Sequence, residues 1–416
     1  MADIGLDSGT LSYTGVPILD ETWRSKVVNN TKSDWLVLSN YDGSVLCSGA
    51  NSFPGGWNSN ESGTAGYFRI FSRDFLSYSP NGRSEPIAPI NILYTRDNVR
   101  NRVGSSGAVS EDGSVVIIGA PTEATNLLNF SSNRDVYIMR RVGNGYVETR
   151  NIDYGANRTG YESKNLAASR DCSHFIQAGY RDCNVYSATS SGNDIWSTLT
   201  STAEFDQGSA SSPIRSALMD FKGLTCCVIT AGLIYFIRRN GTTWNGTDYT
   251  QIPLPTPLSV TGGNIQLDGG ATFSSDGKEL YVLTRVGNNT VIAIYRSDDD
   301  WNTFTTGSLD LGELVASSYP TTFPDSPREP SRTRILPRQT LVTRDDDVLI
   351  LGNGDSINFY YYENKTLLNG FTSKKVTSRF NGGLFTGQFA LTMKDRFLLT
   401  QNNNIQYTFS VGKEAF

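Results

Sequence analysis

The sequence predicts an all-β fold made of repeated four-stranded units, and three observations support this prediction. No stretch shows a sustained helical period of apolar residues. The 416 residues include 40 glycines and 11% aromatic residues, which suits many short strands joined by tight turns. One pattern recurs along the chain: a short apolar segment, a turn rich in Asp and Gly, and further strand-like segments.

The repeat is clearest between Gly270 and Phe304. An Asp276-Gly277 turn there is followed by alternating residues from Leu280 to Leu283. Val291–Tyr295 forms the next predicted strand, and Ser297–Trp301 leads into a further one. A sheet of four antiparallel strands cannot bury both of its faces alone, so it requires neighbouring sheets.

The neighbouring units are marked by equivalent turns along the chain. Turns at positions 42, 112, 171, 223, 276, 346 and 395 define seven units. Their spacing of roughly 50 to 70 residues is the spacing expected of propeller blades. The sequence therefore predicts a seven-bladed β-propeller of four-stranded antiparallel blades.

The two ends of the chain predict how the ring closes. The last unit is one strand short, and Leu6–Tyr13 is a strand-like segment without a hairpin partner. Pairing of Leu6–Tyr13 with Ile405–Val411 would complete the last sheet and remove an exposed edge. We expect one propeller domain over residues 1–416, with an N-terminal closing strand in 1–25 and seven blades in 32–411.

Charge and hydropathy exclude several classes of partner. The formal net charge is -5, and no basic cluster is longer than the pairs Arg140-Arg141 and Lys374-Lys375. Nucleic-acid binding requires a longer basic stripe, so no nucleic acid is expected. No apolar run approaches about 18 residues, which predicts no membrane span. The first residues lack the basic and apolar parts of a secretory signal peptide, so synthesis in the cytoplasm is expected.

Catalytic and metal-binding side chains are scarce. His174 is the single histidine and lies beside Phe175 in a predicted core strand, which favours a structural role. A Ser/His/Asp hydrolase is therefore hard to build. Cys226 and Cys227 are adjacent on a strand and should point to opposite faces as small buried side chains. No Cys or His occurs at zinc-ligand spacing, and we expect no disulfide framework.

Two acidic clusters, Asp298–Asp300 and Asp345–Asp347, lie in predicted turns. Neither has oxygen ligands at alternate positions followed by a bidentate Glu, so both are interpreted as solvated turns. We expect no catalytic residue, no metal site and no cofactor.

Two segments resemble known propeller families. Gly104–Pro121, with an Asp112-Gly113 turn and a terminal Gly-Ala-Pro, resembles an FG-GAP or WD40-like propeller repeat, although it lacks the Asp-x-Asp-x-Asp run of calcium-binding forms. Ser297–Phe304 is similar to the Asp-box of sialidase-type propellers, with Trp301 in the glycine place. The sialidase resemblance implies an arginine triad, a Tyr/Glu nucleophilic pair and an acidic proton donor, and no local motif assigns these roles.

The predicted partner surface lies on the face opposite the Asp-Gly turns. Three long connections share that face: Ala50–Ala65, Ala120–Arg134 and Ser317–Arg334. A tryptophan within a Gly/Asn/Ser loop, with amides and arginines around it, is suited to a protein or glycan partner. The predicted partner-binding residues are Trp57, Asn58, Asn126, Asn129, Arg328 and Arg332.

The resulting functional prediction is a non-enzymatic structural or recognition module that binds a protein partner in an assembly or a surface glycan. Richness in Ser, Thr, Asn and Gly together with scarce lysine resembles virion-associated proteins of viruses and phages, such as capsid decorations or tail adhesins, which implies a place on the virion surface. The alternative is a sialidase-like glycan hydrolase, since two suitably spaced carboxylates would suffice for glycoside hydrolysis. An intracellular WD40-like scaffold is the third reading.

Overall fold

The structure is a computed structural model in which every described element is a β-strand. It describes residues 17–26, 36–40, 44–50, 67–72, 91–94, 104, 106–119, 134–153, 165–178, 182–188, 199–206, 214, 216–230, 233–253, 271–286, 289–310, 339–343, 348–353, 356–361, 372–377, 390–391, 397–402 and 405–413. No helix long and apolar enough to cross a membrane occurs in these ranges.

The strands form seven four-stranded antiparallel sheets, numbered here in chain order. The first sheet consists of β2 (Leu36–Ser39), β3 (Val45–Ala50), β4 (Tyr67–Ser72) and β5 (Asn91–Tyr94). The second consists of β6 (Ser106–Val109), β7 (Val115–Gly119), β8 (Arg134–Val142) and β9 (Gly145–Asp153). The third consists of β10 (Asn165–Ala168), β11 (His174–Ala178), β12 (Asp182–Ala188) and β13 (Leu199–Asp206).

The remaining sheets repeat this order. The fourth consists of β14 (Ser216–Met219), β15 (Thr225–Ile229), β16 (Leu233–Asn240) and β17 (Thr243–Pro253). The fifth consists of β18 (Ala271–Phe273), β19 (Glu279–Val286), β20 (Asn289–Arg296) and β21 (Thr305–Asp310). The sixth consists of β22 (Gln339–Thr343), β23 (Val348–Asn353), β24 (Ser356–Tyr361) and β25 (Thr372–Thr377). The seventh consists of β26 (Ala390–Leu391), β27 (Phe397–Asn402), β28 (Ile405–Lys413) and β1 (Pro17–Lys26).

The seventh sheet corrects one prediction. The N-terminal strand that pairs with β28 is β1, with Pro17 opposite Lys413 and Lys26 opposite Ile405. The other edge of β28 is occupied by β27, so no edge remains for the predicted partner Leu6–Tyr13, which itself lies outside the described residues. A β-bulge between Glu21 and Trp23 shifts the register and interrupts the period-two pattern that identifies strands in a sequence. The sequence therefore predicts this strand too early in the chain.

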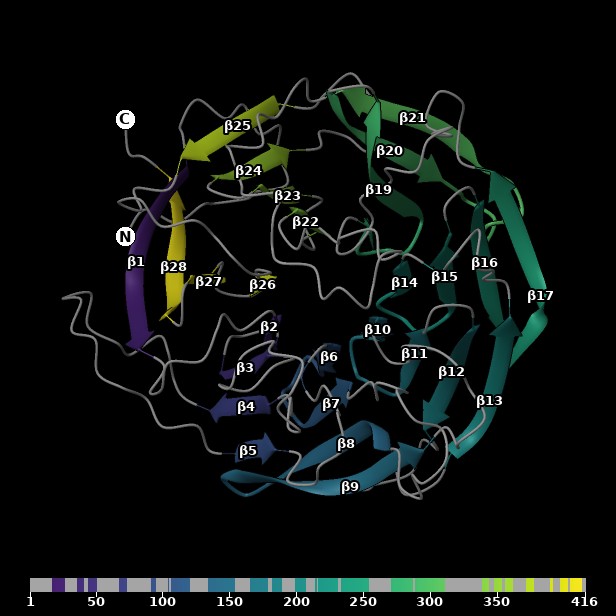
Figure 1. Ribbon diagram of the computed structural model, residues 1–416. Coiled ribbons are helices and arrows are strands. Elements are labelled where there is room, and N and C mark those ends of the chain that lie inside the picture. The colour runs from purple at the N-terminus through teal and green to yellow at the C-terminus, as the bar shows by residue number, and fades with distance from the viewer. Residues whose placement is uncertain are drawn as a thin grey trace, which may run out of the picture.

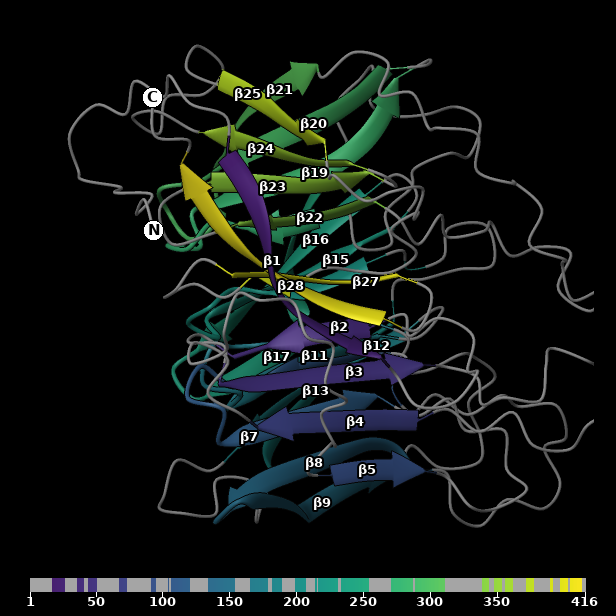
Figure 2. The same ribbon diagram turned by 90° about the vertical axis from the view of Figure 1, so that its left-hand side faces the viewer.

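The sheets are arranged around a common axis, with the first strand of each sheet innermost (Figure 1). β2 contacts β6, and the contacts continue from β6 to β10, β14, β18 and β22, while β2 also contacts β26. The strands run between the two faces of this arrangement, as the side view shows (Figure 2). We call the face that carries the turns between first and second strands the turn face, and the opposite one the loop face.

Two of the second strands are buried along their whole length because neighbouring sheets cover both of their faces. All five residues of β7 are buried, and so are all five of β15. In β15, Cys226 packs into a cluster with the third sheet, whereas Cys227 packs into a cluster with the fifth. The prediction that these two side chains face opposite ways is confirmed.

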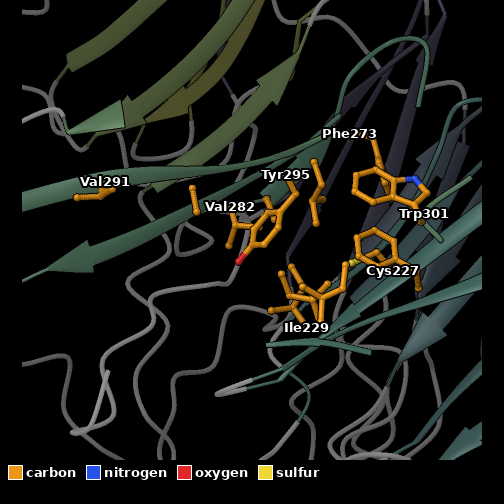
Figure 3. Close-up of a cluster of buried hydrophobic side chains, with 13 residues drawn as sticks. Cys227, Ile229, Phe273, Val282, Val291, Tyr295 and Trp301 are labelled. Carbon is orange, nitrogen blue, oxygen red and sulfur yellow. The ribbon is translucent and has the colours of Figure 1, made fainter. Parts of the chain in front are cut away.

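The cluster between the fourth and fifth sheets shows how the sheets are held together (Figure 3). Trp301 is 2% exposed, stacks on Phe236 with ring centroids 4.1 Å apart, and meets Phe273 edge-on at 5.9 Å. Aromatic pairs of this kind contribute about 0.5–1.5 kcal/mol beyond the burial of their area. The hydrophobic core is thus divided among the boundaries between sheets.

Candidate functional site

The predicted partner-binding residues fall in three connections that lie outside the described part of the chain. Trp57 and Asn58 belong to residues 51–66, Asn126 and Asn129 to residues 120–133, and Arg328 and Arg332 to residues 311–338. The flanking strands β3, β7 and β21 all end on the loop face, because each runs away from the turn face. The assignment of a partner surface to these residues stays a prediction.

The described part of the turn face is built from a repeated local device. In the second sheet, Ser110 Oγ donates to Asp112 Oδ1 at 2.7 Å and accepts from the Val115 N–H at 2.9 Å. Asp112 Oδ1 also accepts from the Ser114 N–H at 2.9 Å. Gly113 follows Asp112 with a φ of 69°, a conformation that favours glycine. The Asp-Gly signal in the sequence therefore specifies this turn locally.

The same device recurs in the third and fifth sheets. Ser169 donates to Asp171 at 2.6 Å, and Ser274 donates to Asp276 at 2.7 Å. In the third sheet Cys172 occupies the glycine position with a φ of 55°. These carboxylates act as turn caps, which accounts for their presence without a catalytic or metal-binding role.

The electrostatics of the turn carboxyls agree with a capping role. Burial raises the pKa of the Asp112 carboxyl, but hydrogen bonds from Ser114 and Ser110 outweigh burial, and the pKa lies below its ordinary value. The pKa of Asp171 is lowered in the same way, since hydrogen bonds from Ser169 and Ser173 outweigh burial. Both groups are ionised and hydrogen-bonded at neutral pH, so neither is suited to donate a proton as a general acid.

Adjacent turns are joined into a continuous layer. The Glu111 N–H donates to the Arg170 carbonyl at 2.7 Å, and the Arg170 N–H donates to the Phe221 carbonyl at 2.9 Å. A Cβ on Gly113 would come within 2.6 Å of Val45 in the first sheet. These close approaches hold the second, third and fourth turns in fixed relative positions, so this described part of the turn face is a rigid platform.

His174 belongs to a partly buried polar network that joins the third and fourth sheets. Its Nδ1 lies 2.7 Å from Ser187 Oγ, which also accepts from Trp244 Nε1 at 3.0 Å. Arg239 Nη1 contacts His174 Nε2. Because a guanidinium only donates, Nε2 accepts and Nδ1 carries the ring proton, which it donates to Ser187.

This network explains why a close Ser–His pair is not a hydrolytic dyad. Ser187 is 1% exposed, so its hydroxyl is closed to a substrate. The histidine donates to that hydroxyl and cannot withdraw its proton in this arrangement. Burial, followed by the nearby Arg239 charge, lowers the pKa of His174 to about 4, although Asp171 opposes the shift. His174 is therefore neutral at pH 7, and its geometry fits a structural role.

The acidic cluster Asp298–Asp300 forms a turn between β20 and β21. Ser297 Oγ donates to Asp299 at 2.9 Å and accepts from the Trp301 N–H at 2.8 Å, and Asp299 accepts from Thr303. Trp301 has a φ of 67°, and its indole N–H donates to the Gly277 carbonyl at 3.2 Å. The likeness to an Asp-box stays a prediction from the sequence. Asp345–Asp347 lies outside the described residues.

The described ranges offer no other side chains placed for catalysis or metal binding. The seven innermost strands contain no Asp, Glu or His. All five cysteines are free and buried, and burial raises the thiol pKa of Cys47, Cys172, Cys226 and Cys227. No group of three or more His, Cys, Asp or Glu residues suited to a metal ion occurs there.

Comparisons with known proteins concern the fold. A scan against protein-family models finds no match. A search of curated proteins also finds none. The chain is similar to a chain of the mitotic checkpoint complex, with a TM-score of 0.56 and 11% identity over 98% of this chain and 100% of that one. It is similar to Raptor of Chaetomium thermophilum, with a TM-score of 0.54 and 10% identity over 96% of this chain and 30% of that one.

Two further solved structures have TM-scores below 0.5. The C-terminal WD40 domain of Sif2 matches at 0.47 with 9% identity over 95% of this chain and 99% of that one. A putative 6-phosphogluconolactonase from Bacteroides uniformis matches at 0.48 with 13% identity over 82% of this chain and 84% of that one. The antiparallel four-stranded sheets around a common axis (Figure 1) are those of a β-propeller. Sequence identities of 9% to 13% carry no information on activity.

Proposed function

We propose that this chain is a closed seven-bladed β-propeller that acts as a non-enzymatic scaffold for protein partners. The proposal rests on one observation. The Ser, His and Asp side chains that could act in catalysis instead form hydrogen bonds that hold the fold together. Ser187 and His174 join two sheets, and Asp112, Asp171 and Asp299 cap turns. What the described surface offers is a rigid, hydrogen-bonded platform, which suits binding rather than turnover.

The closed ring is supported by the pairing of β1 with β28 and by contacts of β2 with β26. In a closed ring of this kind the first and last parts of the chain share one sheet, and β1 covers the edge of β28. A scaffold benefits because its two faces keep a fixed shape when partners bind.

Within this proposal, the loop-face residues Trp57, Asn58, Asn126, Asn129, Arg328 and Arg332 form a partner surface. An aromatic anchor surrounded by amides and arginines has the composition of an interface centre. Replacing Trp57 by Ala should weaken attachment to a partner by roughly 1 to 4 kcal/mol. Association with a virion surface and binding of a glycan rest on composition alone and stay predictions.

The scaffold proposal is tested by isolating the tagged full-length chain from its native cells and measuring the mass and composition of what is bound. A discrete complex of fixed stoichiometry is expected. Recovery of only the free chain would contradict a scaffold. Steady turnover of sialosides or aryl glycosides that disappears on changing a single carboxylate would instead establish the hydrolase alternative.

A further inference from the structure

The turn between β14 and β15 in the fourth sheet differs in sequence from the equivalent turns of the neighbouring sheets. The differences are not needed to form the turn. At the position of the capping carboxylates Asp112, Asp171 and Asp276, the fourth sheet has Lys222. Where the other turns have Ser114, Ser173 and Lys278, it has Leu224, whose side chain is 44% exposed.

The capping role is retained by a carboxylate at a different position. Asp220 stands where the other turns have Ser110, Ser169 and Ser274. Its Oδ1 accepts from the Leu224 N–H at 2.8 Å and from the Thr225 N–H at 3.2 Å. Asp220 is 4% exposed, so its charge is directed into the turn. The side chains of Lys222 and Leu224 therefore take no part in capping the turn, and both residues are exposed at its tip.

Two arginines lie beside this tip. Leu224 accepts from the Arg239 N–H at 2.8 Å through its carbonyl, and Arg238 lies opposite Thr225 in the sheet. Arg238 donates to the Asp300 carbonyl at 3.0 Å and to Asn302, and Arg239 donates to His174. None of the cations Lys222, Arg238 and Arg239 has a carboxylate within ion-pair distance in the described part of the chain.

We propose that this surface, the fourth-sheet tip formed by Lys222, Leu224, Arg238 and Arg239, binds an acidic segment of a protein partner that places an apolar side chain against Leu224. The inference rests on the proposed scaffold function and identifies one chemistry of partner. Three cations that form no ion pair among the described residues lie together on a chain of net charge -5, and such a local positive region attracts an acidic segment. The exposed leucine adds an apolar contact, which favours a polypeptide over a nucleic acid, whose binding needs a longer basic stripe.

The surroundings orient the segment. On the side of the fifth sheet, the exposed carboxylates of Asp299 and Asp300 repel an acidic chain. On the side of the third sheet, Arg170 covers the Phe221 ring with its guanidinium carbon 4.9 Å from the ring centroid. Arg170 Nε also lies 3.7 Å from Glu111 Oε2. The segment therefore crosses the tip toward Phe221 and the third sheet rather than toward β21.

The proposal is tested with the full chain and a fluorescein-labelled peptide of ten residues containing Glu, Asp and Leu. Fluorescence anisotropy should show binding that weakens with added salt. A peptide with Lys in place of each acidic residue should not bind. The double change Lys222→Glu with Leu224→Ser should weaken binding about tenfold or more, because it removes the attraction and the apolar contact together.

The controls are Lys278→Glu, which reverses an exposed lysine of the next turn, and Val142→Ser, which alters another exposed apolar side chain. Both should bind within about twofold of the native chain, since neither touches the tip. Absence of peptide binding, equal binding of both peptides, unchanged binding by the double variant, or stronger binding of oligo(dT) would each overturn the proposal. A native partner complex that survives the double change refutes this inference alone, whereas absence of any partner complex refutes the scaffold proposal.

Discussion

Alanine substitutions at Gly223 and Gly241 separate two contributions to the loss in free energy of unfolding. One is the clash of the added Cβ with a neighbouring sheet, and the other is the backbone strain of a residue at positive φ. Both glycines lie in the fourth sheet and have positive φ, 64° for Gly223 and 61° for Gly241. A Cβ on Gly241 would meet nothing within 4 Å. A Cβ on Gly223 would lie 2.6 Å from His174 Cδ2 and 3.0 Å from Ser169 Cβ in the third sheet.

The two alanine variants should therefore differ in stability. Gly241→Ala incurs only the left-handed backbone cost, about 1–2 kcal/mol, partly offset by the lower entropy of its unfolded chain. Gly223→Ala has the same backbone cost and must also displace the His174 ring. Overpacking of this kind costs about 1–3 kcal/mol. The displaced ring would lose its bond to Ser187, which adds about 1 kcal/mol.

Urea unfolding followed by far-UV circular dichroism and tryptophan fluorescence gives both free energies of unfolding. We expect Gly223→Ala to be less stable than Gly241→Ala by about 2–4 kcal/mol. Gly143→Ala, which also has open space around the added carbon, should behave like Gly241→Ala. Equal losses for Gly223→Ala and Gly241→Ala would refute the inference that the turns of adjacent sheets are packed against each other.

Three further predictions follow from the same geometry. His174 has a pKa of about 4 in the folded chain, below the value of about 6.5 for a free side chain, so the unfolded chain binds one more proton between these two pH values. The free energy of unfolding should therefore fall on acidification from about pH 6.5 to about pH 4. In a pH series of urea melts, His174→Gln should flatten this dependence. The Tyr295 hydroxyl is buried without a partner among the described residues, so Tyr295→Phe should leave the free energy of unfolding equal or higher in thermal melts. Tyr281→Phe loses a hydrogen bond to Glu279 and should lower the free energy of unfolding by about 1 kcal/mol. Deleting residues 1–26 removes β1, and in calorimetry this should lower the melting temperature far more than deleting residues 1–16. Equal melting curves for the two deletions would show that the pairing of β1 with β28 does not stabilise the fold.

The turns and the buried strands could be predicted from the sequence because their causes are local. Asp112-Gly113 and Asp276-Gly277 specify their turns through a carboxylate that caps nearby N–H groups and a glycine that accepts positive φ. Adjacent Cys226 and Cys227 separate to opposite faces because side chains alternate along any strand. Repetition of these local signals along the chain then indicates the number of sheets and their order.

Contacts between distant segments were decided by the tertiary structure. The sequence predicts Leu6–Tyr13 as the closing strand, whereas β28 pairs with Pro17–Lys26, whose alternation is interrupted by a bulge. His174, Ser187, Trp244 and Arg239 meet only because the third and fourth sheets pack together, and no spacing in the sequence signals that meeting. The energy of such contacts depends on which surfaces face each other after folding, whereas turn and strand signals act over a few neighbouring residues.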